Sequence, residues 1–187
     1  MTGVAGCSDD AGSSAEGSAP GASVTAEAPG TPSGEETDGQ STTGGQSTPE
    51  EAVATLVTAI IEDDKGRACR VTGTAATGSE PAKPHTAAMC DSDSPDVQQM
   101  NKVVDSLRTS FTPEGANGQA DTEVAEVAAA DGKAVVPGEG ITVNGQTLNE
   151  IMLSHSTGLT ADQLDTAFEV TEVQGAWYVT DMKLGVG

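Results

Sequence analysis

Aromatic and basic residues are scarce in this sequence. Only four of its 187 residues are Phe, Trp or Tyr, while 23 are Gly, so the chain lacks the bulky side chains that a large core along its whole length needs. Eight Lys and Arg stand against 29 Asp and Glu, which gives a net charge of −21. Such a charge repels nucleic acid, and the few bases are scattered without aromatic neighbours. We therefore expect one modest domain that does not bind nucleic acid.

Long apolar runs and metal-ligand patterns are also missing. No segment has the roughly 20 apolar residues of a membrane-spanning helix. The two histidines, His85 and His155, have no second histidine or acid at metal-ligand spacing. Asp91, Asp93 and Asp96 lie close together but lack the glycine and the final acid of a calcium loop, so we assign them to the start of the following helix, whose dipole favours carboxylates. We expect no metal and no cofactor.

The first quarter of the chain has almost no apolar surface. Between residues 8 and 47, Val24 is the only branched aliphatic residue, and seven acids occur without a single base. Burial of so little apolar surface cannot offset a backbone ordering cost of about 1–2 kcal/mol per residue. We predict that residues 8–47 form a disordered tether rich in Gly, Ser, Thr and acids.

Two amphipathic helices are predicted after this segment. In "TPEEAVATLVTAII", Thr48 is placed as an N-cap, a proline follows it, and Glu51 completes a capping box. The apolar residues of this helix recur at helical spacing: Val53, Leu56, Val57, Ile60 and Ile61. The helix is expected to end near residues 64–66. "SPDVQQMNKVVDSLRTSF" repeats the cap and proline at Ser94, and a short helical turn is expected over residues 66–71.

After residue 113, apolar residues tend to recur at every second position, which indicates β-strands. Three turn dipeptides separate the short runs: Asp131-Gly132, Asn144-Gly145 and Gln174-Gly175. The second turn should set Ile141 and Val143 on the same face as Leu148. The third should bring Phe168 and Val170 beside Trp177 and Val179. We predict an α+β domain over residues 48–187, in which N-terminal helices pack on a curved antiparallel sheet.

Residues 4–7, "VAGC", resemble the lipobox of bacterial lipoproteins. An aliphatic residue and two small residues precede Cys7, which would receive the lipid. The resemblance implies that residues 1–7 are the remnant of a signal peptide, with its charged and apolar parts encoded upstream of Met1. It also implies anchoring of the protein to the outer face of the cell membrane through Cys7. The Ala, Gly, Thr and Asp bias is similar to that of actinobacterial surface proteins.

The sequence contains three cysteines, so one of them has no partner for a disulfide within the chain. If Cys7 carries a lipid, Cys69 and Cys90 are the remaining pair, and a disulfide between them is expected outside the reducing cytosol. Their Cα atoms should then lie about 4.4–6.8 Å apart. Two buried free thiols are the alternative.

Residues 48–187 are similar to the small cone-shaped α+β domains of the NTF2-like superfamily. The resemblance rests on the first helix, on "RACRV" after it and on the closing hairpin "EVQGAWYVTDMKL". It implies a pocket between sheet and helices that serves catalysis in some members and binding in others. The pocket candidates are His155, expected at the end of a strand, together with Trp177 and Tyr178, for which core packing is the first interpretation.

The leading hypothesis is a non-enzymatic, extracytoplasmic lipoprotein that displays a small binding or assembly domain, with the protein partner or small ligand left open. One alternative is an extracytoplasmic enzyme or small-molecule carrier that uses the cone pocket. Its acids and bases would converge from separate strands: Asp165, Asp181, Tyr178 and His155. The other alternative is a soluble protein in which Cys7 is incidental.

Overall fold

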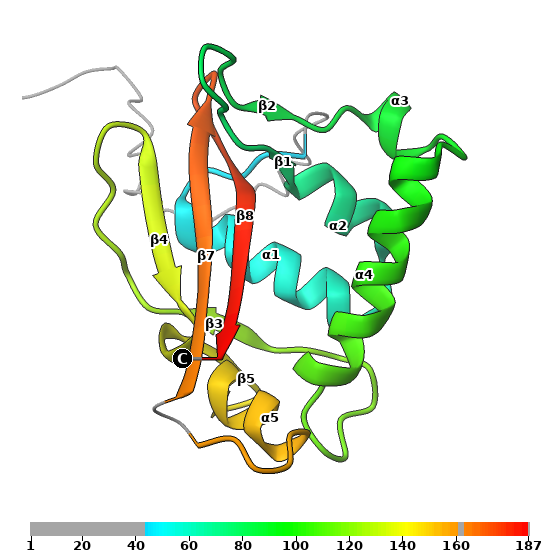
Figure 1. The fold of residues 1–187 in the computed structure, drawn as a ribbon, viewed down its shortest axis with the longest axis vertical. Coiled ribbons are helices and arrows are strands. Elements are labelled where there is room, and N and C mark those ends of the chain that lie inside the picture. The colour runs from blue at the N-terminus through cyan, green and yellow to red at the C-terminus, as the bar shows by residue number, and fades with distance from the viewer. Residues whose placement is uncertain (1–43, 161–162, 187) are drawn as a thin grey trace, which may run out of the picture. The chain divides into compact units, whose positions relative to one another are not determined.

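The computed structural model describes residues 44–160 and 163–186 (Figure 1). The predicted signal-peptide remnant, Cys7 and residues 8–43 of the predicted tether lie outside the described residues. The main helices precede the long strands, and the strand ladders are antiparallel, so the domain is α+β as predicted. In the described part of the chain, no helix is both long and apolar enough to cross a membrane.

The predicted helices are confirmed. The helical elements are α1 (Pro49–Ile61), α2 (Lys65–Val71), α3 (Ala87–Cys90), α4 (Pro95–Phe111), α5 (Leu148–Ser154) and the 3-10 helix η1 (Gly138–Gly140). The side chains of Thr48 and Ser94 each accept the backbone amide three residues on, as N-caps do. In α1 the Glu51 carboxylate accepts the amide of Ser47, at 3.1 Å, one residue before the cap. The helix ends at Ile61, earlier than expected.

The strands form separate sheets rather than the one curved sheet that the sequence predicts. They are β1 (Gly73–Thr74), β2 (Lys83–Pro84), β3 (Thr122–Val124), β4 (Lys133–Pro137), β5 (Ile141–Val143), β6 (Gln146–Thr147), β7 (Leu164–Val173) and β8 (Ala176–Val186). One three-stranded sheet has the order β3-β5-β6 and another the order β4-β7-β8, while β1 pairs with β2. All three predicted turn dipeptides have positive φ at both residues: Asp131-Gly132, Asn144-Gly145 and Gln174-Gly175.

Helix α5 explains why the sheet divides. The strand β6 ends at Thr147, and Leu148 is the first residue of α5 rather than part of a strand. Its side chain still joins those of Ile141 and Val143 in the core. The Thr147 side chain accepts the amide of Glu150 at 3.2 Å, and the Glu150 carboxylate accepts the amide of Thr147 at 3.0 Å. With this capping box α5 begins directly after β6, and the chain later pairs with β4 as β7.

The β7–β8 hairpin is the longest strand pair. Val170 lies opposite Val179, as predicted. Trp177 lies opposite Glu172, so Phe168 is not beside it as predicted. The register shifts between Glu169 and Val170, which places Phe168 opposite Met182. The shift is a β-bulge that adds one residue to β8.

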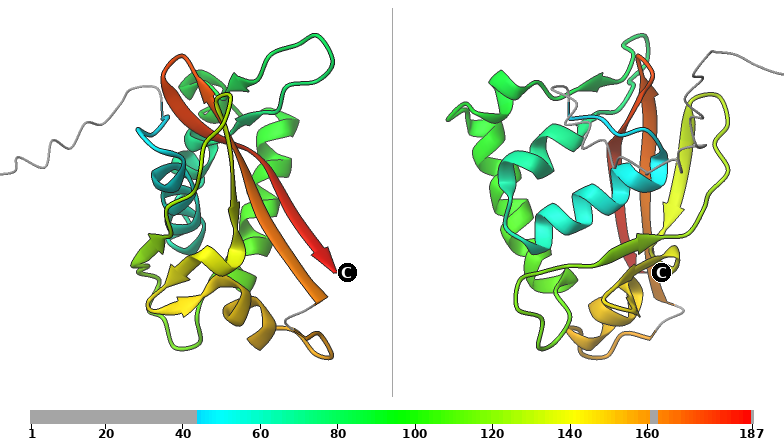
Figure 2. Two further views of the ribbon diagram at one scale, coloured as in Figure 1. Left: turned by 90° about the vertical axis from the view of Figure 1, so that its left-hand side faces the viewer. Right: turned by 180° about the vertical axis from the view of Figure 1, so that it is seen from behind.

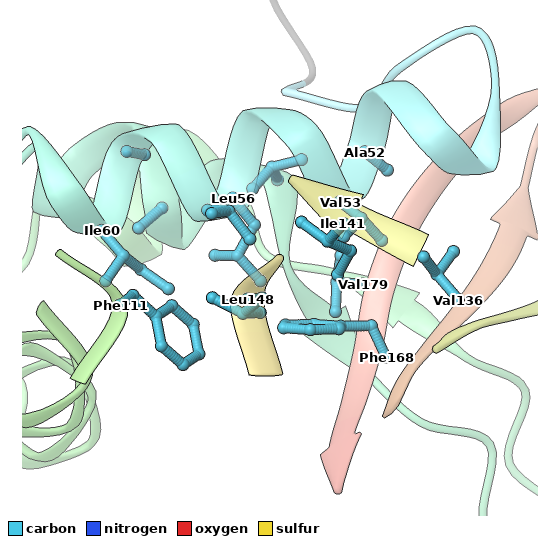
Figure 3. Close-up of a cluster of buried hydrophobic side chains, with 14 of the residues drawn as sticks. Ala52, Val53, Leu56, Ile60, Phe111, Val136, Ile141, Leu148, Phe168 and Val179 are labelled. Atoms are coloured by element: carbon cyan, nitrogen blue, oxygen red, sulfur yellow. The ribbon is translucent and has the colours of Figure 1, made fainter. Parts of the chain in front are cut away.

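Helix α1 lies at the centre of the core and crosses one face of the β4-β7-β8 sheet (Figures 2 and 3). All five apolar residues predicted to line this helix are buried. Phe111 of α4 meets Phe168 of β7 edge to face, with ring centroids 6.3 Å apart. Leu148 of α5 belongs to the same cluster (Figure 3). Helices α1, α2, α4 and α5 and both three-stranded sheets therefore share one core.

The chain already contacts the domain before the predicted boundary at residue 48. Gln46 and Trp177 exchange two backbone hydrogen bonds of 3.1 and 2.8 Å. A Cβ atom on Gly45 would lie 2.5 Å from Cζ of Tyr178, so the close approach needs glycine. We call residues 44–47 the strap.

Candidate functional site

A disulfide fixes the segment that covers the candidate site. Cys69 of α2 is bonded to Cys90 at the end of α3, with Cα atoms 5.7 Å apart. The predicted pair is confirmed, and two free thiols are excluded. The bond ties α2 to the end of a segment that contains β1, β2 and α3. We call this segment, residues 73–90, the flap.

His85 lies on the flap and is bound back to the end of α2. Its backbone amide donates to the Thr72 carbonyl at 3.1 Å, and its ring Nδ1 lies 3.1 Å from Thr72 Oγ1. The Thr72 hydroxyl donates its one proton to the Cys69 carbonyl at 2.8 Å. We therefore assign the ring proton of neutral His85 to Nδ1, which leaves the lone pair on Nε2.

The environment of His85 favours the neutral ring. Burial lowers the pKa of His85, because an imidazolium loses hydration there, and a hydrogen bond with the Cys69 backbone opposes this only in part. Near neutral pH the ring is therefore an uncharged hydrogen-bonding group.

A cleft of about 230 Å³ lies between the flap and the tip of the β7–β8 hairpin. It is lined by Pro84, His85, Thr86, Ala87, Val173, Gln174, Ala176 and Tyr178. Apolar and neutral polar side chains alternate around it, and none of these lining residues carries a carboxylate. The cleft can hold a small, uncharged group and offer it hydrogen bonds from an imidazole, an amide and a hydroxyl.

The structure separates the three predicted pocket residues. Tyr178 is buried and lines the cleft, whereas the neighbouring Trp177 belongs to the core cluster. The expectation that His155 ends a strand is wrong. It is the C-cap of α5, and its Nε2 lies 2.9 Å from the carbonyl oxygen of Thr112 at the end of α4. His155 therefore joins two helix ends, and the histidine beside Tyr178 at the cleft is His85.

The residues of the enzyme alternative also lie apart. Asp165 is opposite Gly185, seven residues along β8 from Tyr178, which corresponds to about 20 Å of strand. Asp181 lies between these positions and accepts the amide of Met182. These carboxylates do not line the cleft that Tyr178 lines.

The histidine at the cleft has only a weak signal in the sequence. His85 falls between the two paired cysteines, in a stretch rich in Pro, Gly and Thr, and nothing local indicates that this stretch folds back onto a hairpin more than 80 residues later. Within residues 44–160 and 163–186, no group of three or more His, Cys, Asp and Glu side chains is placed to hold a metal ion. Comparison of the chain with family models, curated proteins and solved structures finds no match.

Proposed function

We propose that this protein is a lipoprotein anchored through Cys7 to the outer face of a bacterial cell membrane, where it displays a small binding or assembly domain. The observation that carries the proposal is the Cys69–Cys90 disulfide. It uses both cysteines of the domain and leaves Cys7 as the one remaining thiol of the sequence. Stable disulfides are typical of proteins outside the cytosol, and the lipobox resemblance of residues 4–7 gives Cys7 its role.

The cleft supports binding rather than catalysis. Its volume of about 230 Å³ is below the roughly 300–1,000 Å³ of ordinary small-molecule sites. Its lining holds His85 in a neutral state beside apolar residues, without a carboxylate to act as its partner in proton transfer. A cleft of this kind suits one amino-acid side chain of a partner protein, or a small neutral molecule.

We also propose that the domain is a variant of the NTF2-like cone. The order of helices before antiparallel strands and the packing of α1 across the β4-β7-β8 sheet support this relationship (Figure 2). The test is superposition of an experimentally determined structure on NTF2-like domains. Failure of β4, β7 and β8 to superpose with the matching order and direction contradicts the cone.

Lipid attachment is tested in a bacterium that matures lipoproteins. The gene is expressed from its genomic reading frame, including the codons upstream of Met1, in cells fed an alkyne-labelled fatty acid. We expect the label on the wild-type protein in the membrane fraction and its loss in Cys7→Ser. The matched control is the double variant Cys69→Ser/Cys90→Ser, which should keep the label. A wild-type protein that reaches the membrane fraction without label contradicts the anchor.

A further inference from the structure

The border of β8 that faces away from β7 is covered over only part of its length (Figure 1). Near the hairpin tip, the strap residue Gln46 pairs with Trp177, and Thr72 bridges to Val179. From Thr180 onwards, no strand or bridge among the described residues occupies this border. The second half of β8 is therefore an edge strand, and edge strands are templates for pairing with another chain.

The bulge determines which residues of β8 point their backbone amide and carbonyl groups towards this border. Trp177 presents its amide and carbonyl to the border, where both bond to Gln46. Because the bulge adds one residue before Met182, Met182 presents its backbone to the same border. Its amide donates to Oδ1 of Asp181 at 2.9 Å. The Asp181 side chain thus occupies the Met182 amide, a backbone donor that an added strand could bond instead.

Exposed side chains accompany this backbone. Leu184 is 44% exposed and is one of three large apolar side chains exposed in the described part of the chain. Asp181 and Lys183 are exposed and, two residues apart, share the outer face of the sheet. Lys183 also forms an ion pair with Glu169 of β7. The border therefore offers an apolar side chain together with one charge of each sign.

We propose that residues 180–184 of β8 pair with the same residues of a second copy of the chain, antiparallel and with Met182 opposite Met182. The arrangement has the two-fold symmetry of most homodimers. It places Asp181 opposite Lys183 of the second copy, and it does so twice. Each Asp181 side chain turns from its own Met182 amide to that lysine, and the two Met182 residues exchange backbone hydrogen bonds.

Repulsion between like charges disfavours the neighbouring registers of this strand pair. A shift of two residues in one direction sets Lys183 opposite Lys183, and the same shift in the other direction sets Asp181 opposite Asp181. Like charges directly opposite each other destabilise a strand pair. Thr72 already occupies the border at Val179, which ends the ladder at Thr180. Because the ladder is short and the chain carries a net charge of −21, the dimer is weak and forms only at high protein concentration.

Sedimentation velocity of the chain 1–187 over a range of concentrations tests the pairing. We expect reversible dimers of the wild type. Asp181→Lys and Lys183→Asp should each weaken association by about tenfold or more, because two attractive pairs become two repulsive ones. An equimolar mixture of the two variants restores complementary pairs and should restore dimers, now of mixed composition.

Two control variants make the same changes of charge elsewhere. Glu123→Lys lies on β3, and Lys133→Asp lies on β4 at the opposite border of the sheet. Both should dimerise within about twofold of the wild type. Circular dichroism confirms that each variant is folded. A wild type that stays monomeric at every concentration overturns the proposal, as do variants that fail to recover on mixing. Stronger self-association of Asp181→Lys alone also overturns it, because Asp181 would then only block the border.

Discussion

At His85, burial and hydrogen bonding have opposite effects on the pKa of the imidazole ring. Burial dominates and lowers the pKa of the ring, while its contacts with Thr72 and Cys69 hold it in place. In the unfolded chain the ring returns to its ordinary pKa of about 6.5. As the pH falls below that value, the unfolded state binds a proton that the folded state disfavours, so the free energy of unfolding decreases.

We therefore expect the urea midpoint of the wild type to fall as the pH is lowered from about 8 to about 5. His85→Gln, which has no titrating ring, should lose the part of this decline that belongs to His85. His155→Gln replaces the other, exposed histidine and is measured alongside as the matched control. Equal pH profiles of His85→Gln and the wild type contradict the assignment.

Gly45 supports a second prediction at this scale. An alanine there places its Cβ 2.5 Å from Cζ of Tyr178, so strap and ring must move apart at a cost of about 1–3 kcal/mol. The only tryptophan of the sequence, Trp177, is bonded to the strap and reports the movement. We expect a red shift of its emission and a lower urea midpoint. Gly140→Ala, where the nearest atom is 3.6 Å away, should change neither.

Helices whose starts are marked by nearby capping residues could be predicted from the sequence. Strand pairings between segments far apart in the chain could not. Thr48 and Ser94 mark the starts of α1 and α4 because a capping side chain acts only on the next turn of the helix. The capping box at Thr147 and Glu150 is equally local, but the turn just before it closes the short β5–β6 hairpin. Continuing the second strand of that hairpin through Leu148 conceals the start of the helix. The return of the chain to β4 as β7 depends on the packing of α5, which no short segment encodes.

The capping box of α5 is tested by Thr147→Ala. The substitution removes the side chain that accepts the Glu150 amide, and we expect it to lower the free energy of unfolding by about 0.5–2 kcal/mol. Thr147→Ser keeps the hydroxyl and should stay close to the wild type. Chemical denaturation measures both variants. Equal losses for alanine and serine would show that the methyl group, and not the cap, is responsible.

Over the whole molecule, the cleft depends on contacts between distant segments. His85 reaches Tyr178 only because the disulfide and β1–β2 pairing fold the flap back, and because the hairpin brings its tip to the flap. The sequence indicates the disulfide through the cysteine count and Tyr178 through the hairpin, but not their meeting. This is why His155, at the end of a helix, could be mistaken for the pocket histidine.

Loss of the disulfide should affect the whole domain. The bond spans 21 residues, and in the chain-entropy model a loop of this length contributes about 3 kcal/mol. We expect Cys69→Ser/Cys90→Ser to lower the free energy of unfolding by about that amount in urea titrations. A reducing agent should bring the wild type to the same stability and leave the double variant unchanged. Cys7→Ser is the control, and destabilisation of it by the same amount would contradict this account.

The strap also determines how the domain bears mechanical load. A pull on the chain from upstream of Gly44 reaches the fold through the two hydrogen bonds between Gln46 and Trp177. These bonds lie at the border of β8 near the hairpin tip, so they carry the force before the core does. One residue upstream of these bonds, Gly45 packs against Tyr178, which also lines the cleft. Tension that peels the strap away would therefore uncover one wall of the cleft while the disulfide still holds the other.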